Sequence, residues 1–186
     1  MISAQLRLWS VKEYHRMLKA GILTSVDRVE LLDGQIIQMS PQLPPHAGTV
    51  QRIDKYFKQL LSNQADVRVQ LPITLSTSEP EPDIAVVQIS SNDYGDRHPG
   101  TENIFLMIEV ADRTLNFDCE QKAAIYAKAE IADYWVINVN QRQVHVFRQP
   151  DGGMYQSKMI VSANSSLAPL AFPTLEIPLN LLFLPQ

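Results

Sequence analysis

Several residue types and patterns that define other protein classes are scarce in this 186-residue chain. A single cysteine, Cys119, excludes an internal disulfide framework and a cysteine-rich zinc site. No apolar run approaches the roughly 20 residues of a membrane span. The opening segment, MISAQLRLWS, lacks the apolar core of a secretory signal. We therefore expect a cytoplasmic protein with no membrane partner.

Positive charge is also scarce, with 16 Lys and Arg against 20 Asp and Glu and a net charge of −4. A nucleic-acid-binding protein usually shows a basic footprint, so the charge counts mildly against tight DNA binding. The best local candidate is a helical set, Arg52, Lys55 and Lys58, which a solvated helix face explains at least as well. A metal ion in an acidic site would contribute some of the missing positive charge.

Three motif classes are missing altogether. The chain has no glycine-rich phosphate loop, no nucleophile elbow and no cluster of histidines and cysteines. Nucleotide-hydrolysing, serine-hydrolase and zinc-enzyme functions therefore have no support, and we expect no nucleotide cofactor.

The pattern that is present predicts one α/β domain over residues 1–186 with a mixed central sheet. Ser10 and Glu13 form a capping box that opens a helix ending at Ala20, and Asp33-Gly34 suits the tight turn of a hairpin over 29–39. We divide the chain into an N-terminal helix and hairpin (10–39), a core (about 45–139) and C-terminal strands with a tail (143–186). The core and C-terminal part are predicted to contain helices at 46–61 and 118–129 and strands at 67–75, 83–87, 104–110, 133–139, 143–148 and 154–162.

Two of the predicted strands carry acidic residues at their ends. The segment EPEPDIAVV (79–87) opens a strand on Asp83, and IFLMIEV (104–110) runs from five apolar residues into Glu109. If these strands are antiparallel neighbours, Asp83 and Glu109 converge and need a cation between them. Mg²⁺ or Mn²⁺, helped by the Val110 carbonyl, fits such oxygen ligands.

The next helix supplies a lysine on its inward face. Asp118 and Gln121 form a plausible capping box, after which Lys122, Ile125 and Tyr126 share one apolar face. Either the stem of Lys122 packs while its ammonium reaches water, or the lysine belongs with the acid pair. Two carboxylates and a lysine suit metal-assisted phosphodiester cleavage, so the second interpretation is favoured in combination.

The motif strings EPEPDIAVV, FLMIEVADRT and FDCEQKAAIYAKAEIADYWVINV, with the order helix, three strands, helix, strand, resemble the PD-(D/E)XK nuclease superfamily. Within it, the chain is similar to a large bacterial family of restriction-endonuclease-like proteins. The resemblance implies a restriction endonuclease-like core (α-β-β-β-α-β), an endonuclease that hydrolyses DNA, and Mg²⁺ or Mn²⁺ as cofactor. It places Asp83 and Glu109 as the acids and, because Ala111 occupies the usual lysine position, moves that role to Lys122.

The hairpin ELLDGQIIQMSP and a histidine opening the next helix are also typical of this family. They make Glu30 and His46 candidate accessory residues, against an exposed strand residue and an ordinary helix-capping histidine. Tyr126 is expected to pack in the core with its hydroxyl near the site. Glu79 and Glu81 are interpreted as solvent-facing, and Asp118 as a helix cap rather than a ligand.

Two other functions remain open. The chain could be an inactive nuclease fold that binds nucleic acid or protein, or an interaction protein whose acidic pair is only a salt-bridge cluster. Cleavage separates the nuclease from the first alternative, and metal binding separates it from the second. A homodimer is expected if the nuclease cuts duplex DNA, because one site cuts one strand.

Overall fold

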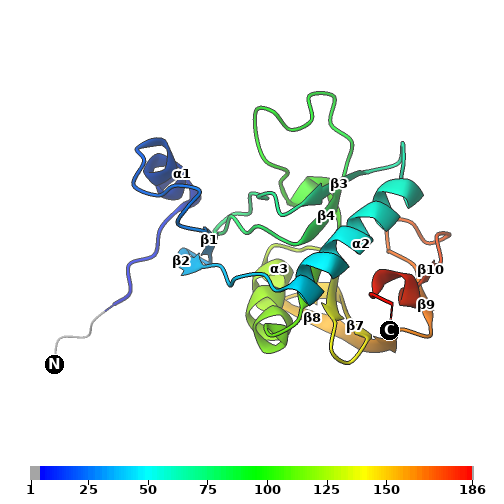
Figure 1. Cartoon of the computed structure of the whole chain (residues 1–186). Helices are drawn as coiled ribbons and strands as arrows, with labels where there is room; N and C mark the ends of the chain where they lie inside the picture. The colour runs from blue at the N-terminus through cyan, green and yellow to red at the C-terminus, as the bar shows by residue number, and fades with distance from the viewer. Residues whose placement is uncertain (1–4, 186) are drawn as a thin grey trace.

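The computed structural model describes residues 5–185, and its centre is a six-stranded mixed sheet (Figure 1). Neighbouring strands are antiparallel except for β5 and β6, which are parallel. In spatial order the strands are β3 (Asp66–Val69), β4 (Ile84–Val87), β5 (Ile104–Ala111), β6 (Asp133–Asn138), β7 (Gln143–Asp151) and β8 (Met154–Ser162). This sheet confirms the predicted mixed α/β architecture.

Two helical elements complete the core and cover opposite faces of the sheet. α2 (Pro44–Leu60) precedes β3, and the parallel crossover from β5 to β6 contains the π-helical turn η2 (Phe117–Lys122) and α3 (Ala123–Lys128). The order α2-β3-β4-β5-α3-β6 is the predicted α-β-β-β-α-β core. The chain therefore places the strand that carries Glu109 directly beside the helix that carries Lys122.

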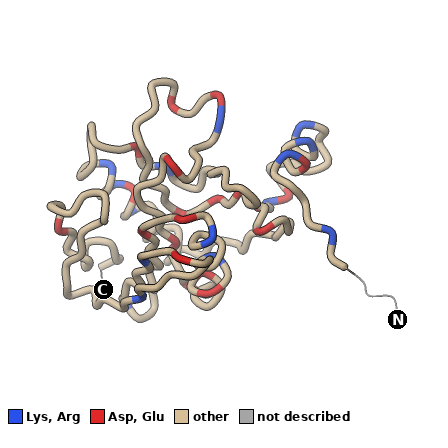
Figure 2. Tube along the Cα trace, turned by 180° about the vertical axis from the view of Figure 1, so that it is seen from behind, with Lys and Arg blue, Asp and Glu red and all other residues tan. Residues whose placement is uncertain are grey.

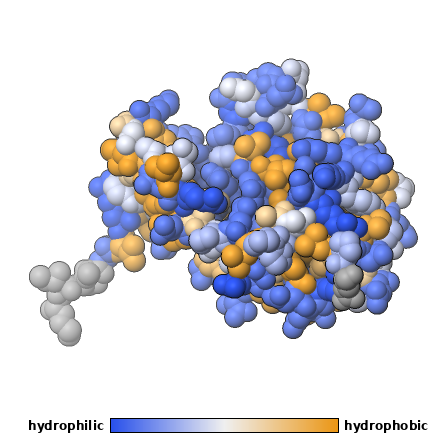
Figure 3. Space-filling view, in the orientation of Figure 1, coloured by the Kyte–Doolittle hydropathy of each residue, from blue (hydrophilic) through white to orange (hydrophobic). Residues whose placement is uncertain are grey.

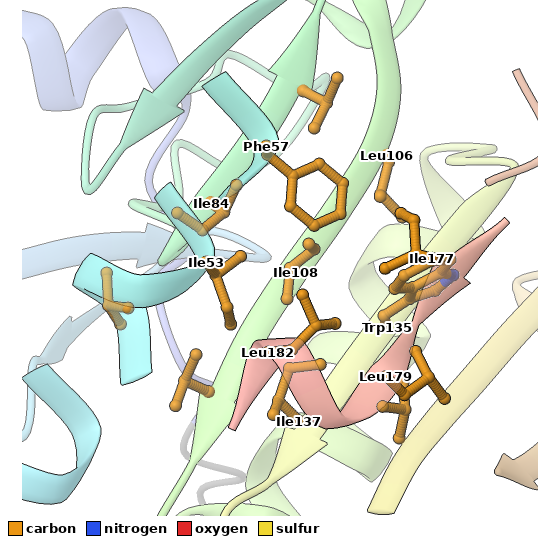
Figure 4. Close-up of a cluster of buried hydrophobic side chains, with 14 of the residues drawn as sticks. Ile53, Phe57, Ile84, Leu106, Ile108, Trp135, Ile137, Ile177, Leu179 and Leu182 are labelled. Carbon is orange, nitrogen blue, oxygen red and sulfur yellow. The ribbon is translucent and has the colours of Figure 1, made fainter. Parts of the chain in front are cut away.

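Alternation along the strands decides which residues meet which helix. Ile84, Ile108 and Trp135 belong to the apolar cluster that packs against α2 (Figure 4). Met107 and the other residues of opposite parity belong to a second cluster with Tyr126 of α3. Asp83 and Glu109 have the parity of this second face, so both carboxylates point toward the α3 side of the sheet.

The N-terminal unit lies beside the sheet and contains α1 (Val11–Lys19), β1 (Val29–Leu32) and β2 (Gln35–Gln38). Figure 1 shows α1 set apart from the body, while a bridge between Leu31 and Glu79 attaches the hairpin to the core. The Ser10–Glu13 capping box is present, and the hairpin turns on Asp33 and Gly34 with φ of 47° and 79°. Both features were predicted from sequence.

The C-terminal tail packs on the same face of the sheet as α2. It contains β9 (Ser166–Leu167), β10 (Ile177–Pro178) and the 3₁₀ turn η3 (Leu179–Leu182). Outside the tail, a further 3₁₀ turn, η1 (Thr101–Asn103), precedes β5. Leu179 and Leu182 are fully buried in the first cluster. These two leucines therefore hold the tail against the same apolar cluster as α2.

Two predicted boundaries were wrong. The strand expected at 67–75 ends at Val69, because Gln70 adopts a φ of 51° and Pro72 has no N–H for a ladder. The helix expected from Asp118 begins earlier, since the Asp118 N–H already donates to the Thr114 carbonyl at 2.9 Å. Asp118 is therefore not its cap.

The face shown in Figure 3 is mostly hydrophilic, with apolar side chains at scattered places and on the N-terminal unit around α1. Within the α1 unit, Ile22 and Val26 are 70% and 85% exposed. Among the helices of residues 5–185, none has both the length and the apolar character needed to cross a membrane.

Candidate active site

The acid pair predicted from sequence lies at one end of the β4–β5 ladder. Ile84 pairs with Ile108 across the two antiparallel strands, so Asp83, one residue before β4, lies beside Glu109. The Val110 N–H donates to Asp83 Oδ2 at 2.9 Å, and the Asp83 N–H donates to Glu109 Oε2 at 3.3 Å. Asp83 is 8% exposed and Glu109 is 3% exposed. The strand ladder itself thus holds both carboxylates together in a buried position.

Lys122 reaches this pair from the π-helical turn. Its Nζ donates to Glu109 Oε1 at 2.9 Å and lies 3.4 Å from Glu30 Oε1. The residue is 7% exposed, so the interpretation of an ammonium that reaches bulk water was wrong. Tyr126, one turn further on, donates its hydroxyl to the same Glu109 oxygen at 2.8 Å. π-helical turns are rare and often occur at functional sites.

Two further side chains bind Asp83. His46, in the first turn of α2, has its Nε2 3.0 Å from Asp83 Oδ2. Gln70 donates its side-chain amide to Asp83 Oδ1 at 3.1 Å. The structure thus brings His46 to the acid pair, whereas Gln70 was missed. The only sequence signal near Gln70 is Pro72, two residues later, which disfavours a strand that continues through it.

Glu30 and Asp118 lie deeper than the sequence suggested. Glu30 is 4% exposed and accepts the Glu81 N–H at 3.1 Å, so it is not an exposed strand residue. Asp118 is 4% exposed, accepts the Thr114 hydroxyl at 2.5 Å and lines the same pocket as the acid pair. Its interpretation as a helix cap was wrong, because the π-helical turn places it one turn before Lys122.

Glu79 has a structural position rather than a solvent-facing one. It is 3% exposed, and its carboxylate binds His15 of α1 at 2.7 Å and the Thr74 hydroxyl at 2.8 Å. The interaction with His15 joins α1 to the core. The interpretation of Glu79 as a solvated carboxylate was therefore wrong, while Glu81 is only partly buried and lines the pocket.

The site holds more negative than positive charge, and burial is the largest cause of the raised pKa values of its acids. Burial raises the pKa of Glu109 to about 8, against the opposing charge of Lys122 and with the support of Asp83, Asp118 and Glu30. Burial also raises the pKa of Asp118 to about 6. Both shifts show that a further cation in the pocket would favour the charged carboxylates.

In the two basic residues of the site, the neighbouring carboxylates outweigh burial, so their raised pKa values favour the charged forms. Burial alone would lower the pKa of Lys122, but the carboxylates of Glu109, Glu30 and Asp118 outweigh it and hold that pKa well above its usual range. Burial would likewise lower the pKa of His46, but the hydrogen bond and charge of Asp83 raise it. The carboxylates around Lys122 thus favour its charged form.

The acid pair opens onto a pocket of about 610 Å³ between the hairpin, α2 and the segment after β5. Glu30, His46, Asp118 and Lys122 line it together with Asp83 and Glu109. In a strand the N–H and C=O of one residue point to the same edge, so the Val110 carbonyl faces the same edge as its N–H, toward Asp83.

These oxygen atoms form a donor set for a hard divalent cation. Two carboxylates and a backbone carbonyl on one side of an open pocket suit Mg²⁺, which usually keeps several waters and binds only one or two carboxylates. No three Asp, Glu, His or Cys side chains within residues 5–185 are arranged as a complete metal-ligand group. A cation here would therefore share its coordination between Asp83, Glu109, Val110 and solvent.

The basic helix face considered for DNA binding is largely occupied by internal contacts. Arg52 donates to the Leu181 carbonyl at 2.7 Å, and Lys58 pairs with Asp54 at 2.8 Å. These contacts fix the tail and the helix surface. The interpretation of this set as an ordinary helix face therefore fits the structure.

A sheet of this topology, with two acids on adjacent strands and a lysine on the crossover helix, defines a nuclease-like fold of the restriction-endonuclease type. Residues 11–180 match the Uma2 family model, described as "Putative restriction endonuclease", and the chain belongs to this family.

Among solved structures, the fold is similar to a protein described as a putative nuclease belonging to DUF820 from Anabaena variabilis ATCC 29413. The TM-score is 0.75 at 16% identity, covering 94% of this chain and 97% of the other. A search of curated proteins found no match. The family and the fold thus agree with the resemblance seen in the sequence.

Proposed function

We propose that this protein is a metal-dependent endonuclease that hydrolyses DNA phosphodiester bonds. One observation carries the proposal: Asp83, Glu109 and Lys122, from three separate elements, converge within hydrogen-bonding distance at an open pocket. Membership of a family described as restriction endonucleases supports the same reaction class. A purely structural salt-bridge cluster would not need an opening onto a pocket of about 610 Å³.

In the proposed reaction Asp83, Glu109 and the Val110 carbonyl would hold Mg²⁺ or Mn²⁺. When bound, such an ion lowers the pKa of a coordinated water and polarises a phosphate oxygen. Lys122 stays protonated between its carboxylates, so it acts as a charged donor to a phosphate oxygen rather than as a base. Tyr126, behind the pocket, and Glu30, in its lining, orient Glu109 and Lys122.

His46 is placed to position Asp83. Its Nε2 binds Asp83, while its Nδ1 is buried without a hydrogen-bond partner in the described part of the chain. A histidine in this position fixes the carboxylate orientation and adds positive charge near a bound phosphate. We assign it a positioning role, with Gln70 holding the other Asp83 oxygen.

A second candidate function is an inactive nuclease fold that binds nucleic acid or protein. The net charge of −4 and the internal use of Arg52 and Lys58 favour it, because they remove the obvious basic surface.

Cleavage of duplex DNA by the active enzyme would need two copies of the chain, one for each strand.

A nicking assay tests the proposal. Supercoiled plasmid is incubated with manganese and the wild type, Glu109→Gln, or Glu102→Gln as a matched control at a 69% exposed side chain. We expect Glu109→Gln to lower the nicking rate by about 1,000-fold or more, as for the loss of an electrostatic catalytic group. Glu102→Gln should match the wild type. Equal nicking by all three proteins would identify a contaminant and overturn the enzyme function.

A further inference from the structure

The arginines of this chain divide into two groups by their contacts. Six of the nine make a side-chain hydrogen bond or ion pair, for example Arg52 and Arg148. Within residues 5–185, Arg16, Arg28 and Arg113 make neither. Unpaired arginine is available for an external anion, since a guanidinium presents five donors that fit phosphate oxygens.

Two of these three arginines lie at the pocket of the acid pair. Arg28 belongs to the segment before β1 and Arg113 to the segment after β5, and both are exposed at the pocket lining. The third, Arg16, lies on α1 and lines none of the pockets described here. Two of the three unpaired arginines of residues 5–185 therefore lie next to the acidic site, one on the segment before β1 and one on the segment after β5.

The pocket continues on both sides, and an arginine lies at each junction. Arg28, Met39, Gln42 and Glu81 also line a pocket of about 470 Å³ next to α1. On the other side, Arg113 and His46 also line a pocket of about 390 Å³. Gln42 lines all three. Because they share lining residues, the three pockets form one continuous groove that includes the acid pair.

Local hydrogen bonds keep the carboxylate of Asp27 from pairing with Arg28. The Asp27 carboxylate accepts the backbone N–H and the hydroxyl of Thr24, at 2.7 and 2.8 Å, instead of pairing with Arg28. The Arg28 backbone has a φ of 47°, a conformation rare for a residue with a side chain, and its carbonyl accepts the Met39 N–H at 2.8 Å. Strained backbone of this kind is found more often at functional positions.

The N-terminal segment that carries Arg28 has the opposite charge balance to the rest of the chain. Residues 5–28 contain five Lys and Arg and two Asp and Glu, whereas the whole chain has 16 and 20. Figure 2 shows these cationic positions gathered on the α1 unit. A polyanion that approaches the acidic floor thus meets Arg28 at the groove, with the other cations of this segment farther out on the N-terminal unit.

We infer that Arg28 and Arg113 bind the backbone phosphates of one nucleic-acid strand on either side of the phosphate at the acid pair. This inference rests on the proposed function and names how that same site holds its substrate. Neither arginine contacts the acid pair, so both are positioning residues. Their contacts are to phosphate, so they fix the register of the strand without reading its sequence.

The test measures binding without cleavage. The full-length protein, in a chelator, is titrated against a fluorescent oligonucleotide, single-stranded in one arm and duplex in the other, from about 50 to 200 mM salt. Arg28→Gln and Arg113→Gln should each weaken binding about three- to tenfold. Each should also reduce the slope of log K against log salt, by about 0.7 for a single strand or 0.9 for a duplex.

Matched variants separate this role from general charge and from folding. Arg16→Gln removes the same charge from α1 away from the groove and should change binding less than about twofold. Arg28→Lys keeps the charge and should restore the salt slope. An unchanged slope in both Arg→Gln variants, an equal effect of Arg16→Gln, or the absence of wild-type binding would overturn the inference. Plasmid nicking by the wild type would then still support the nuclease, so the two failures are distinguishable.

Discussion

The protein contains two buried charge clusters in one sheet, and they are built in opposite ways. At the start of β6, Asp133 is 0% exposed and receives Arg148 at 2.8 and 3.2 Å, the Trp135 indole at 2.8 Å and the Leu170 N–H at 2.8 Å. This cluster faces the tail, with one cation for one anion. The acid pair faces the other side, at a pocket lined by six carboxylates against Lys122, His46 and two arginines.

The difference shows what each cluster is for. The Asp133 cluster satisfies its groups internally and joins the sheet to the tail through the Arg148 bond to the Ala168 carbonyl at 2.7 Å. The acid-pair cluster leaves excess negative charge next to solvent, which costs folding free energy and which a bound cation would offset. Stability and function are therefore assigned to opposite faces of the same sheet.

The largest stability effect is expected from disrupting the Asp133 cluster, whose charges are paired internally. Arg148→Met leaves Asp133 as an uncompensated buried charge, which should cost about 3–5 kcal/mol. For a chain of this size the melting temperature should fall by roughly 6–20 °C. Calorimetry should show this fall, with nicking by the remaining folded protein unchanged.

Two controls sharpen that result. Arg16→Met, which removes an arginine without partners, should shift the melting temperature by less than about 2 °C. The double variant Asp133→Leu/Arg148→Met removes both charges together and should recover much of the loss, because no unpaired ion remains. A melting temperature for Arg148→Met equal to that of Arg16→Met would contradict a stabilising role for the cluster.

In the acid-pair cluster, Lys122→Met should affect activity more than stability. Nicking should fall at least about 100-fold, because a charged donor is lost from the reacting phosphate. Without metal the variant should lose about 1–3 kcal/mol, less than Arg148→Met, since Glu109 with its pKa of about 8 can take up a proton. Added manganese should reduce this deficit. Nicking equal to wild type would exclude the assigned role of Lys122.

Divalent metal should stabilise one cluster and leave the other unaffected. A metal at about 100 times its dissociation constant adds about 2.7 kcal/mol to the free energy of unfolding. Manganese should therefore raise the melting temperature of the wild type and of Arg148→Met, but not of Asp83→Asn. Titration calorimetry should show one dominant site that Asp83→Asn loses. Equal affinity in wild type and Asp83→Asn would remove the acid pair as the metal site.

The same contrast explains how much the sequence could predict. The acid pair could be placed because apolar runs marked two strands, and antiparallel pairing then fixed Asp83 beside Glu109. Lys122 followed from helical spacing. Both predictions rest on the spacing of apolar residues along the chain, and the packing of the core depends on that spacing directly.

The remaining site residues depend on contacts that no local pattern records. Gln70 reaches Asp83 because the chain leaves the ladder at a left-handed residue, and Asp118 enters the pocket because the helix begins earlier and widens into a π-turn. The sequence left Glu30 open between an accessory site residue and an exposed strand residue, and Glu79 was interpreted as solvent-facing. The hairpin docks on the core and buries both. Tertiary docking decided these positions.

The smallest expected effect is in the pH dependence of stability, which should differ between His46 and another partly buried histidine. Asp83 raises the pKa of folded His46 above its usual value of 6.5, so the folded state binds more protons than the unfolded state as pH rises past that value. Its contribution is complete below about pH 6.5 and is lost as pH rises through the folded pKa. Asp83 has a lowered pKa, so its share is lost only in acid.

In a chelator, the wild type should therefore exceed His46→Gln by about 1 kcal/mol near pH 5.5, or roughly 2–4 °C, and by less near pH 8.5. His98 is the matched control: burial lowers its pKa, so the folded state binds fewer protons and stability rises as pH increases through 6.5. The difference between wild type and His98→Gln should thus change with pH in the opposite direction. Parallel pH profiles for the two variants would show that the bond to Asp83 does not set the protonation of His46, and its assigned positioning role would fail with it.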